Sequence, residues 1–480
     1  MALLLRRQYD LTTLVIGFEL AGRQPMVRCT LERDRAGERA QLLDYTLDPA
    51  ELGIPDRLDR SMSLFQGYPF SMPDSVLAAL RAELDARLLP GEAVWLYLKS
   101  PVGYLALAPW EQILFPALAR PVLRLPDFLV DPAQPAGEFN IVLCSSQPIS
   151  EEAFASSEYM ARMTRMILDQ AARRTTVHLF TDGEMMADLT GRLMNYGVYD
   201  SRVILHNPQG AEPFAVPDRT SRITDPSGQL ASPWLLWMRD ALAGRSIDLV
   251  HLIAHGYLSG ESAALSVAEA PLENLDRKLP RFIGPNELGA FLAQTGAWGC
   301  ALTSPLHNYS EMAHRLLVTT LANLRPGPIL HHEMRLDPDL SALAAAYQLL
   351  LAARPTPPPV APSLMLYCHP ARVAPPLPEG GAAALYQLDD ALLAEPDDTN
   401  RFVEELYTPE EEVPGWVSAA MRYIDQRTLE IAQQSEAAPG QAISTSRMAG
   451  LEQSDTLRKL QSIVEDEARS EASSRQGGGQ

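Results

Sequence analysis

The chain has 480 residues, of which 46% are hydrophobic and 21% charged, the balance of an ordinary globular protein with room for two or three domains. Its net charge of −20 argues against nucleic acid and anionic membrane as partners, because both are polyanions. The apolar start, MALLLRR, is too short for a signal peptide, and the run Leu340–Ala353 is too short to span a bilayer. We therefore expect a cytoplasmic protein.

The four cysteines are widely spaced and form neither a CxxC pair nor a metal-ligand pattern: Cys29, Cys144, Cys300 and Cys368. This usage is typical of free thiols in a reducing compartment. His331-His332 and Cys368-His369 each end a predicted strand, but neither has a spaced third ligand. We expect no metal and no other cofactor.

The first 126 residues are predicted to form an α+β region. Short alternating runs separated by turn residues predict three strands, Leu11–Leu20, Met26–Glu32 and Gln41–Leu47. The apolar spacing within Asp74–Leu89 predicts a helix, and Ala93–Leu98 with Tyr104–Ala108 predicts a hairpin. Pro109-Trp110-Glu111 favours the start of another helix, where Glu111 either supports a site or simply begins the helix beside a packed tryptophan.

Residues 127–373 read as the core of the protein. Leu123–Asp131 is a linker-like bridge, and from Phe139 onward buried-strand patterns alternate with helical patterns as far as the last strand, Ser363–Cys368. This alternation predicts an α/β fold with a mostly parallel sheet flanked by helices. The central strand is SIDLVHLIAHGY, Ser246–Tyr257, which ends in His255-Gly256. A histidine at the carboxyl end of such a strand lies where open α/β sheets bind ligands, and it titrates near neutral pH.

The Pro109-Trp110-Glu111 step, the strand ending in His255-Gly256, the following helix and a strand ending near a small residue together resemble the CHAT family over roughly residues 90–370. That family comprises caspase-like domains of the clan CD cysteine peptidases. The resemblance implies a caspase-like sheet, a protein substrate in a bacterial conflict or signalling system, and a His–Cys dyad at the carboxyl ends of two adjacent parallel strands. His255 would be the base, and Gly256 with a neighbouring amide would hold the oxyanion.

The position of the nucleophile has two alternatives. Caspase-type enzymes carry the histidine about 50 residues before the cysteine. Cys300 follows His255 by 45 residues and Ser304 follows it by 49. If the strand that contains Cys300 is short, Cys300 lies at its carboxyl end and the dyad is intact. If the strand starts near Ala297, Cys300 lies within it as a buried thiol, and Ser304, a weak nucleophile without strong activation, faces His255.

Two further segments bear on function. The loop Ser304–Ser310 could line a pocket with His307, Asn308 and Tyr309, or it could be a solvated turn capped by Ser310. Residues 374–480 hold 20 acidic and 8 basic residues and form an acidic extension. Two amphipathic helices are predicted there, Trp416–Gln433 and Leu451–Ala468, which would dock a partner, dock onto the core or complete it.

Two functions follow from these features. One is an active His255/Cys300 cysteine endopeptidase. The other is a catalytically impaired relative that binds a protein partner in the same cleft, with no nucleic acid and no membrane involved. A Cys300 sulfur within about 4–5 Å of the His255 ring would favour the peptidase, and a Ser304 that faces His255 would favour the binding protein.

Overall fold

The structure is a computed structural model that describes residues 9–21, 24–35, 38–54, 70–127, 138–148, 154–171, 173–215, 229–259, 262–272, 279–305, 308–352 and 354–374. The chain divides into two compact units, Met1–Pro378 and Glu379–Gln480, and all the described residues belong to the first. The two helices predicted in the acidic extension and the predicted site residue His307 lie outside the described residues.

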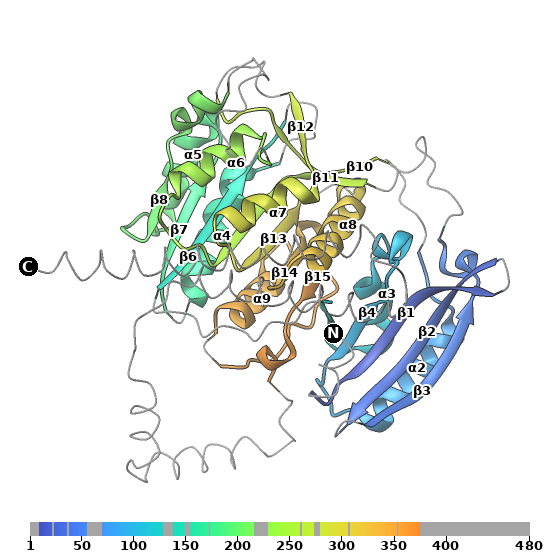
Figure 1. Cartoon of the computed structure of the whole chain (residues 1–480). Helices are drawn as coiled ribbons and strands as arrows, with labels where there is room; N and C mark the ends of the chain where they lie inside the picture. Colours follow the sequence, from blue (N-terminus) through green and yellow to red (C-terminus); the bar gives the residue numbers. More distant parts are fainter. Residues whose placement is uncertain are drawn as a thin grey trace, which may run out of the picture. The chain divides into compact units, whose positions relative to one another are not determined.

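The first unit is α/β and is built on one large, mostly parallel sheet of 12 strands (Figure 1). Their order across the sheet is β3-β2-β1-β4-β5-β15-β14-β13-β9-β6-β7-β8. The strands are β1 (Thr12–Ala21), β2 (Gln24–Arg35), β3 (Glu38–Leu47), β4 (Val94–Leu98), β5 (Val122–Arg124), β6 (Glu138–Ser145), β7 (Arg174–Phe180), β8 (Val203–Leu205), β9 (Leu249–Ile253), β13 (Gly299–Ser304), β14 (Ile329–Glu333) and β15 (Leu364–Tyr367).

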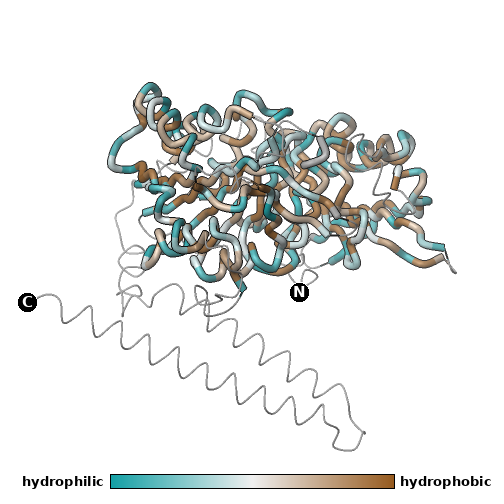
Figure 2. The backbone as a smooth tube through the Cα atoms, turned by 90° about the horizontal axis from the view of Figure 1, so that it is seen from above, coloured by the Kyte–Doolittle hydropathy of each residue, from teal (hydrophilic) through white to brown (hydrophobic). Residues whose placement is uncertain are grey.

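Helices cover both faces of the core part of this sheet. One face packs against α6 (Pro233–Ala241), α7 (Pro285–Gln294) and α8 (Asn308–Leu324). The other packs against α4 (Ser156–Gln170), α5 (Gly183–Asn195) and α9 (Ser341–Leu351). Because both faces are covered, the central strands β9 and β13 are buried along their whole length, and the hydrophobic stretches gather in the middle of the layers (Figure 2).

The amino-terminal region continues the same sheet. Strands β1, β2 and β3 are antiparallel, while β1, β4 and β5 run parallel, and β5 pairs with β15 of the core. The helices α2 (Asp74–Arg87) and α3 (Trp110–Leu118) pack on these strands in a third hydrophobic cluster. The first 126 residues and the core, which the sequence presents as two regions, thus form one compact unit.

Two local predictions are wrong. The expected second hairpin arm, Tyr104–Ala108, is largely a 3-10 helix, η2 (Gly103–Ala106), and β4 pairs with β1 and β5 instead. The expected linker after Leu123 begins within strand β5. Short 3-10 helices also follow β3, β8, β14 and β15: η1 (Pro49–Leu52), η3 (Pro208–Phe214), η6 (Met334–Leu336) and η7 (Pro370–Arg372).

A second, antiparallel sheet of three strands follows β9 directly. It consists of β10 (His255–Ser259), β11 (Ser262–Ala268) and β12 (Pro280–Ile283), in that order. The inner face packs Leu258, Leu265 and Ile283 into the same hydrophobic cluster as α8. Among the helices that the structure describes, none has the length and apolar character needed to cross a membrane.

Candidate functional site at the carboxyl ends of the central strands

His255 lies immediately beyond the carboxyl end of the central strand β9. Only Ala254 separates it from Ile253, the last residue of β9, and His255 is the first residue of β10. Its side chain is fully buried, and the ring of Phe154 meets the imidazole edge-on with 5.9 Å between centroids. Gly256 follows within β10, opposite Leu265, and is buried as well. The predicted place of His255 in the fold is therefore correct, but its imidazole is enclosed.

Ser304 is the residue at the end of the neighbouring parallel strand. Strand β13 pairs with β9 through Thr303 and Ile253, so Ser304 is one step further on, beside the segment that leads into His255. The Ser304 side chain is fully buried, and its hydroxyl donates a hydrogen bond to the backbone oxygen of His332 at 3.4 Å. Ser304, and not Cys300, thus ends this strand, as the second of the two alternatives expected.

Cys300 is at the other end of the same strand. Its partners in the sheet are Val250 and Ile329, so it lies level with the second residue of β9. The five residue steps from Val250 to His255 correspond to roughly 16 Å along an extended strand. The predicted His255/Cys300 dyad is therefore wrong, because the strand starts at Gly299 and leaves its cysteine near the amino end.

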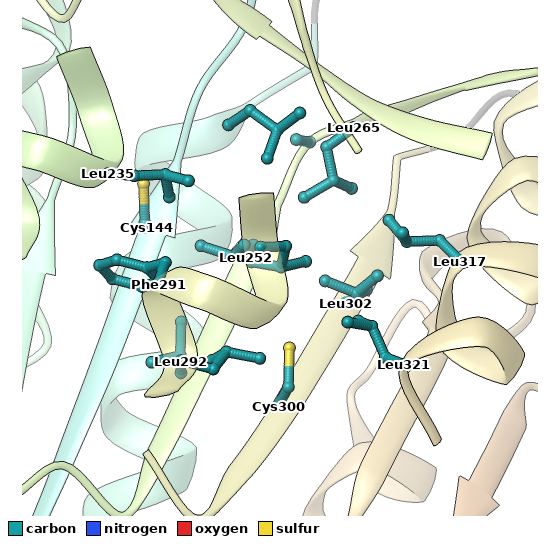
Figure 3. Close-up of a cluster of buried hydrophobic side chains, with 14 of the residues drawn as sticks. Cys144, Leu235, Leu252, Leu265, Phe291, Leu292, Cys300, Leu302, Leu317 and Leu321 are labelled. Atoms are coloured by element: carbon teal, nitrogen blue, oxygen red, sulfur yellow. The ribbon is translucent and has the colours of Figure 1, made fainter. Parts of the chain in front are cut away.

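The surroundings of Cys300 are those of a structural thiol. Its sulfur points into a hydrophobic cluster beside Leu292, Leu302 and Leu321 (Figure 3). Burial raises the pKa of the Cys300 thiol to about 12, so the thiolate is scarce at neutral pH. A cysteine in this state is neither an accessible nor an activated nucleophile.

Two more imidazoles lie on the α8 side of the sheet. His314 of α8 and His331 of β14 are buried, with 5.4 Å between their ring centroids. Burial, with a further contribution from His255, lowers the pKa of His314 to about 3, so this ring is neutral at physiological pH. Within the described residues, no group of three or more histidine, cysteine, aspartate or glutamate side chains is placed to hold a metal ion.

Glu333 ends strand β14, next in the sheet to Ser304. Its carboxylate accepts hydrogen bonds from Gln112 Nε2 at 2.7 and 2.8 Å and from Arg315 Nη1 at 2.8 Å. Burial and the nearby carboxyl group of Glu311 raise the pKa of Glu333 to about 7. Arg335 Nε lies 3.6 Å from Glu311, so two cations face two carboxyl groups at this end of the sheet.

A polar network occupies the opposite face of the same strands. Thr303 Oγ1 lies 2.7 Å from His251 Nε2 and 3.2 Å from His332 Nδ1, and His332 Nε2 lies 3.1 Å from Asp337 Oδ2. His251 Nδ1 is also 2.7 Å from the hydroxyl of Tyr347. The hydroxyl, imidazole and carboxylate have the order of a nucleophile, base and orienting acid.

This network is enclosed, and its hydrogen bonds hold the ends of the strands together. Thr303 and His332 are fully buried and Asp337 is 3% exposed, so a substrate has no access to the hydroxyl. Asp337 also accepts from the backbone nitrogen atoms of Ala342 and Leu343 at the start of α9. This network was not predicted from the sequence. Its signals in the sequence were His251 within an apolar run and the His331-His332 doublet, whose two rings point to opposite faces because side chains alternate along a strand.

The remaining expected site residues follow Ser304 in the sequence. Pro305 is described and buried, and the backbone of Asn308 and Tyr309 begins α8, but their side chains are outside the description. Pro305 has no backbone N–H and so offers no oxyanion donor. A cavity of about 360 Å³ lies elsewhere, between η2 and α8, where Tyr104, Leu316 and Thr319 are among its lining residues.

At one edge of the sheet the structure thus brings together His255, Ser304 and Glu333, at or next to the carboxyl ends of adjacent parallel strands, and leaves Cys300 apart. No protein-family model matches the chain, and no curated protein matches it either.

Proposed function

We propose that this chain is a CHAT-type, caspase-like protein of a bacterial conflict or signalling system. In this proposal it acts in the cytoplasm by binding a partner protein and does not cleave peptide bonds. Two features support the assignment: β9 and β13 are adjacent and parallel, and a histidine follows the first of them. These are the positions at which the family carries its dyad.

The observation that carries the non-catalytic half of the proposal is the residue at the end of β13. A serine stands there, its hydroxyl donates to a backbone oxygen, and the residue after it is a proline. A serine needs a strong base to become a nucleophile, and the oxyanion needs N–H donors. The Ser304 hydroxyl donates to a carbonyl oxygen and not to a base, and Pro305 adds no N–H donor. The cysteine of this strand lies at its far end.

The first prediction is that no peptide hydrolysis depends on Cys300. The full chain is incubated with a diversified peptide library, and new amino termini are counted by mass spectrometry for wild type, His255→Ala and Cys300→Ala. We expect all three to match the protein-free blank, because the Cys300 thiol is buried and protonated.

Cys144 provides a matched control for this experiment. It is a second buried thiol, on strand β6, on the same face of the sheet and in the same hydrophobic cluster as Cys300. Hydrolysis that is lost in Cys300→Ala and His255→Ala but kept in Cys144→Ala would establish the dyad and overturn the proposed function.

A further inference from the structure

The outer face of the small sheet β10–β11–β12 carries an exposed aromatic pair. Tyr257 is 37% exposed and Phe282 is 45% exposed, and their rings stack with 4.1 Å between centroids. His255 and Phe282 both lie opposite Ser266, so the aromatic pair shares a face with His255. Exposed apolar side chains that gather in this way mark interaction sites on soluble proteins.

Strand β12 is also an edge strand of this small sheet. It pairs with β11, and no other described strand pairs with it (Figure 1). Leu279 O accepts from Glu269 N at 2.8 Å, so the backbone of Leu279 and Arg281 faces β11. By alternation the N–H and C=O groups of Phe282 face away from the sheet. Such an edge is a template for another strand.

Arg281 adds a charge requirement. It is half-buried on the side of β12 opposite Phe282, and its Nε is buried without a hydrogen-bond acceptor among the described residues. A buried donor on a charged group is costly when it is left unpaired, and a carboxylate can satisfy a guanidinium with two hydrogen bonds. The edge of β12 therefore has an apolar side at Phe282 and, at Arg281, a side that favours a negatively charged group.

From these three observations we infer that the outer edge of β12 binds an extended segment of a partner protein by strand addition. Side chains of an added strand alternate between the two faces. Those on the Phe282 side are apolar, and those on the Arg281 side are acidic. The inference rests on the proposed function, since it names the partner chemistry for a protein that acts by binding.

The second prediction tests this docking site with synthetic peptides and the full chain. The probe is a fluorescein-labelled peptide that alternates valine or phenylalanine with glutamate. Two comparison peptides carry lysine in place of glutamate, or the same residues grouped in blocks. Fluorescence anisotropy should detect binding of the alternating glutamate peptide alone, because only that peptide meets both sides of the edge.

Variants then locate the binding. Arg281→Glu should lower the affinity for the glutamate peptide by about tenfold or more, and this variant should bind the lysine peptide. Phe282→Ser should lower the affinity for the glutamate peptide several-fold. Tyr199→Ser is the matched control, since Tyr199 is 44% exposed but lies outside the small sheet, and it should leave binding unchanged. Circular dichroism confirms that each variant is folded.

Hydrogen exchange gives a second readout, in which the peptide should protect the Phe282 amide. Absence of binding by wild type, or binding unchanged by both Arg281→Glu and Phe282→Ser, overturns the docking site. Either result leaves the proposed function standing as long as Cys300→Ala is without effect on hydrolysis. Cleavage that depends on Cys300 overturns the proposed function whatever the peptides do.

Discussion

Arg124→Met should lower the free energy of unfolding by about 3–5 kcal/mol, because it leaves a buried carboxylate without its cation. Arg124 is fully buried in β5, and its Nε and Nη2 donate to the two carboxylate oxygens of Glu111 at 2.7 and 3.0 Å. Its Nη1 also lies 3.4 Å from the hydroxyl of Tyr367 in β15. Urea unfolding measures the loss.

The position of this pair adds to the expected effect. Strand β5 joins the amino-terminal strands to the core, since it pairs with β4 on one side and β15 on the other. An uncompensated charge there weakens the seam between the two parts of the sheet. We expect the urea transition of Arg124→Met to shift as a whole and also to broaden, as the amino-terminal part begins to unfold separately.

Two comparison variants separate the charge from the packing. The double variant Arg124→Met/Glu111→Leu removes the orphaned carboxylate and should recover most of the loss. The exposed pair Arg87–Glu83, with side chains 44% and 32% exposed, is the matched surface control. Arg87→Met should lower the free energy of unfolding by less than about 1 kcal/mol. A loss of similar size in Arg124→Met and Arg87→Met would contradict the account.

Arg124 also explains why the sequence predicted this part of the fold badly. The alternation of strands and helices from Phe139 onward predicts the parallel sheet, because buried parallel strands are mostly apolar and stand out. Strand β5 has only three residues and one of them is charged, so it resembles a linker. Its burial depends on Glu111, 13 residues earlier, and no local pattern reveals such a pair.

The site was predictable to a similar degree. The apolar run that ends in His255-Gly256 predicted His255 at the carboxyl end of the central strand, and the structure has it two residues after the end of β9. The spacing to Cys300 and Ser304 could not decide which of them ends β13, because that depends on where the strand begins. The turn at Gly296 and the start of β13 at Gly299 settle it. That His255 also opens a second sheet was not predictable, since β10 continues the chain after a single residue.

The buried carboxyl group of Glu333 should make stability depend on pH in a defined direction. Its pKa is raised from 4.5 to about 7 by burial and by Glu311. Between these values the folded state holds a proton that the unfolded state has lost. The contribution of Glu333 is therefore fully present below about pH 4.5 and is lost as the pH rises to about 7, with a total on the order of 3 kcal/mol at most.

The buried histidines His178 and His314 and the half-buried His206 change the stability in the opposite direction. Burial lowers the pKa values of His178 and His206 to about 4 and that of His314 to about 3. The unfolded state then binds more protons, so these rings add stability as the pH rises toward 6.5, the ordinary pKa of histidine. The wild-type profile alone is therefore a sum of opposing contributions, and Glu333 must be isolated by difference.

Glu333→Gln provides that difference, because glutamine keeps the shape and cannot ionise. Urea unfolding of both proteins at pH 5, 6, 7 and 8 should show similar stability at pH 5 and a variant that is relatively more stable at pH 8. Glu83→Gln, at a partly exposed carboxylate, should leave the wild-type profile unchanged. Parallel profiles for wild type and Glu333→Gln would mean that Glu333 is ionised throughout and that Arg315, 2.8 Å away, outweighs both burial and Glu311.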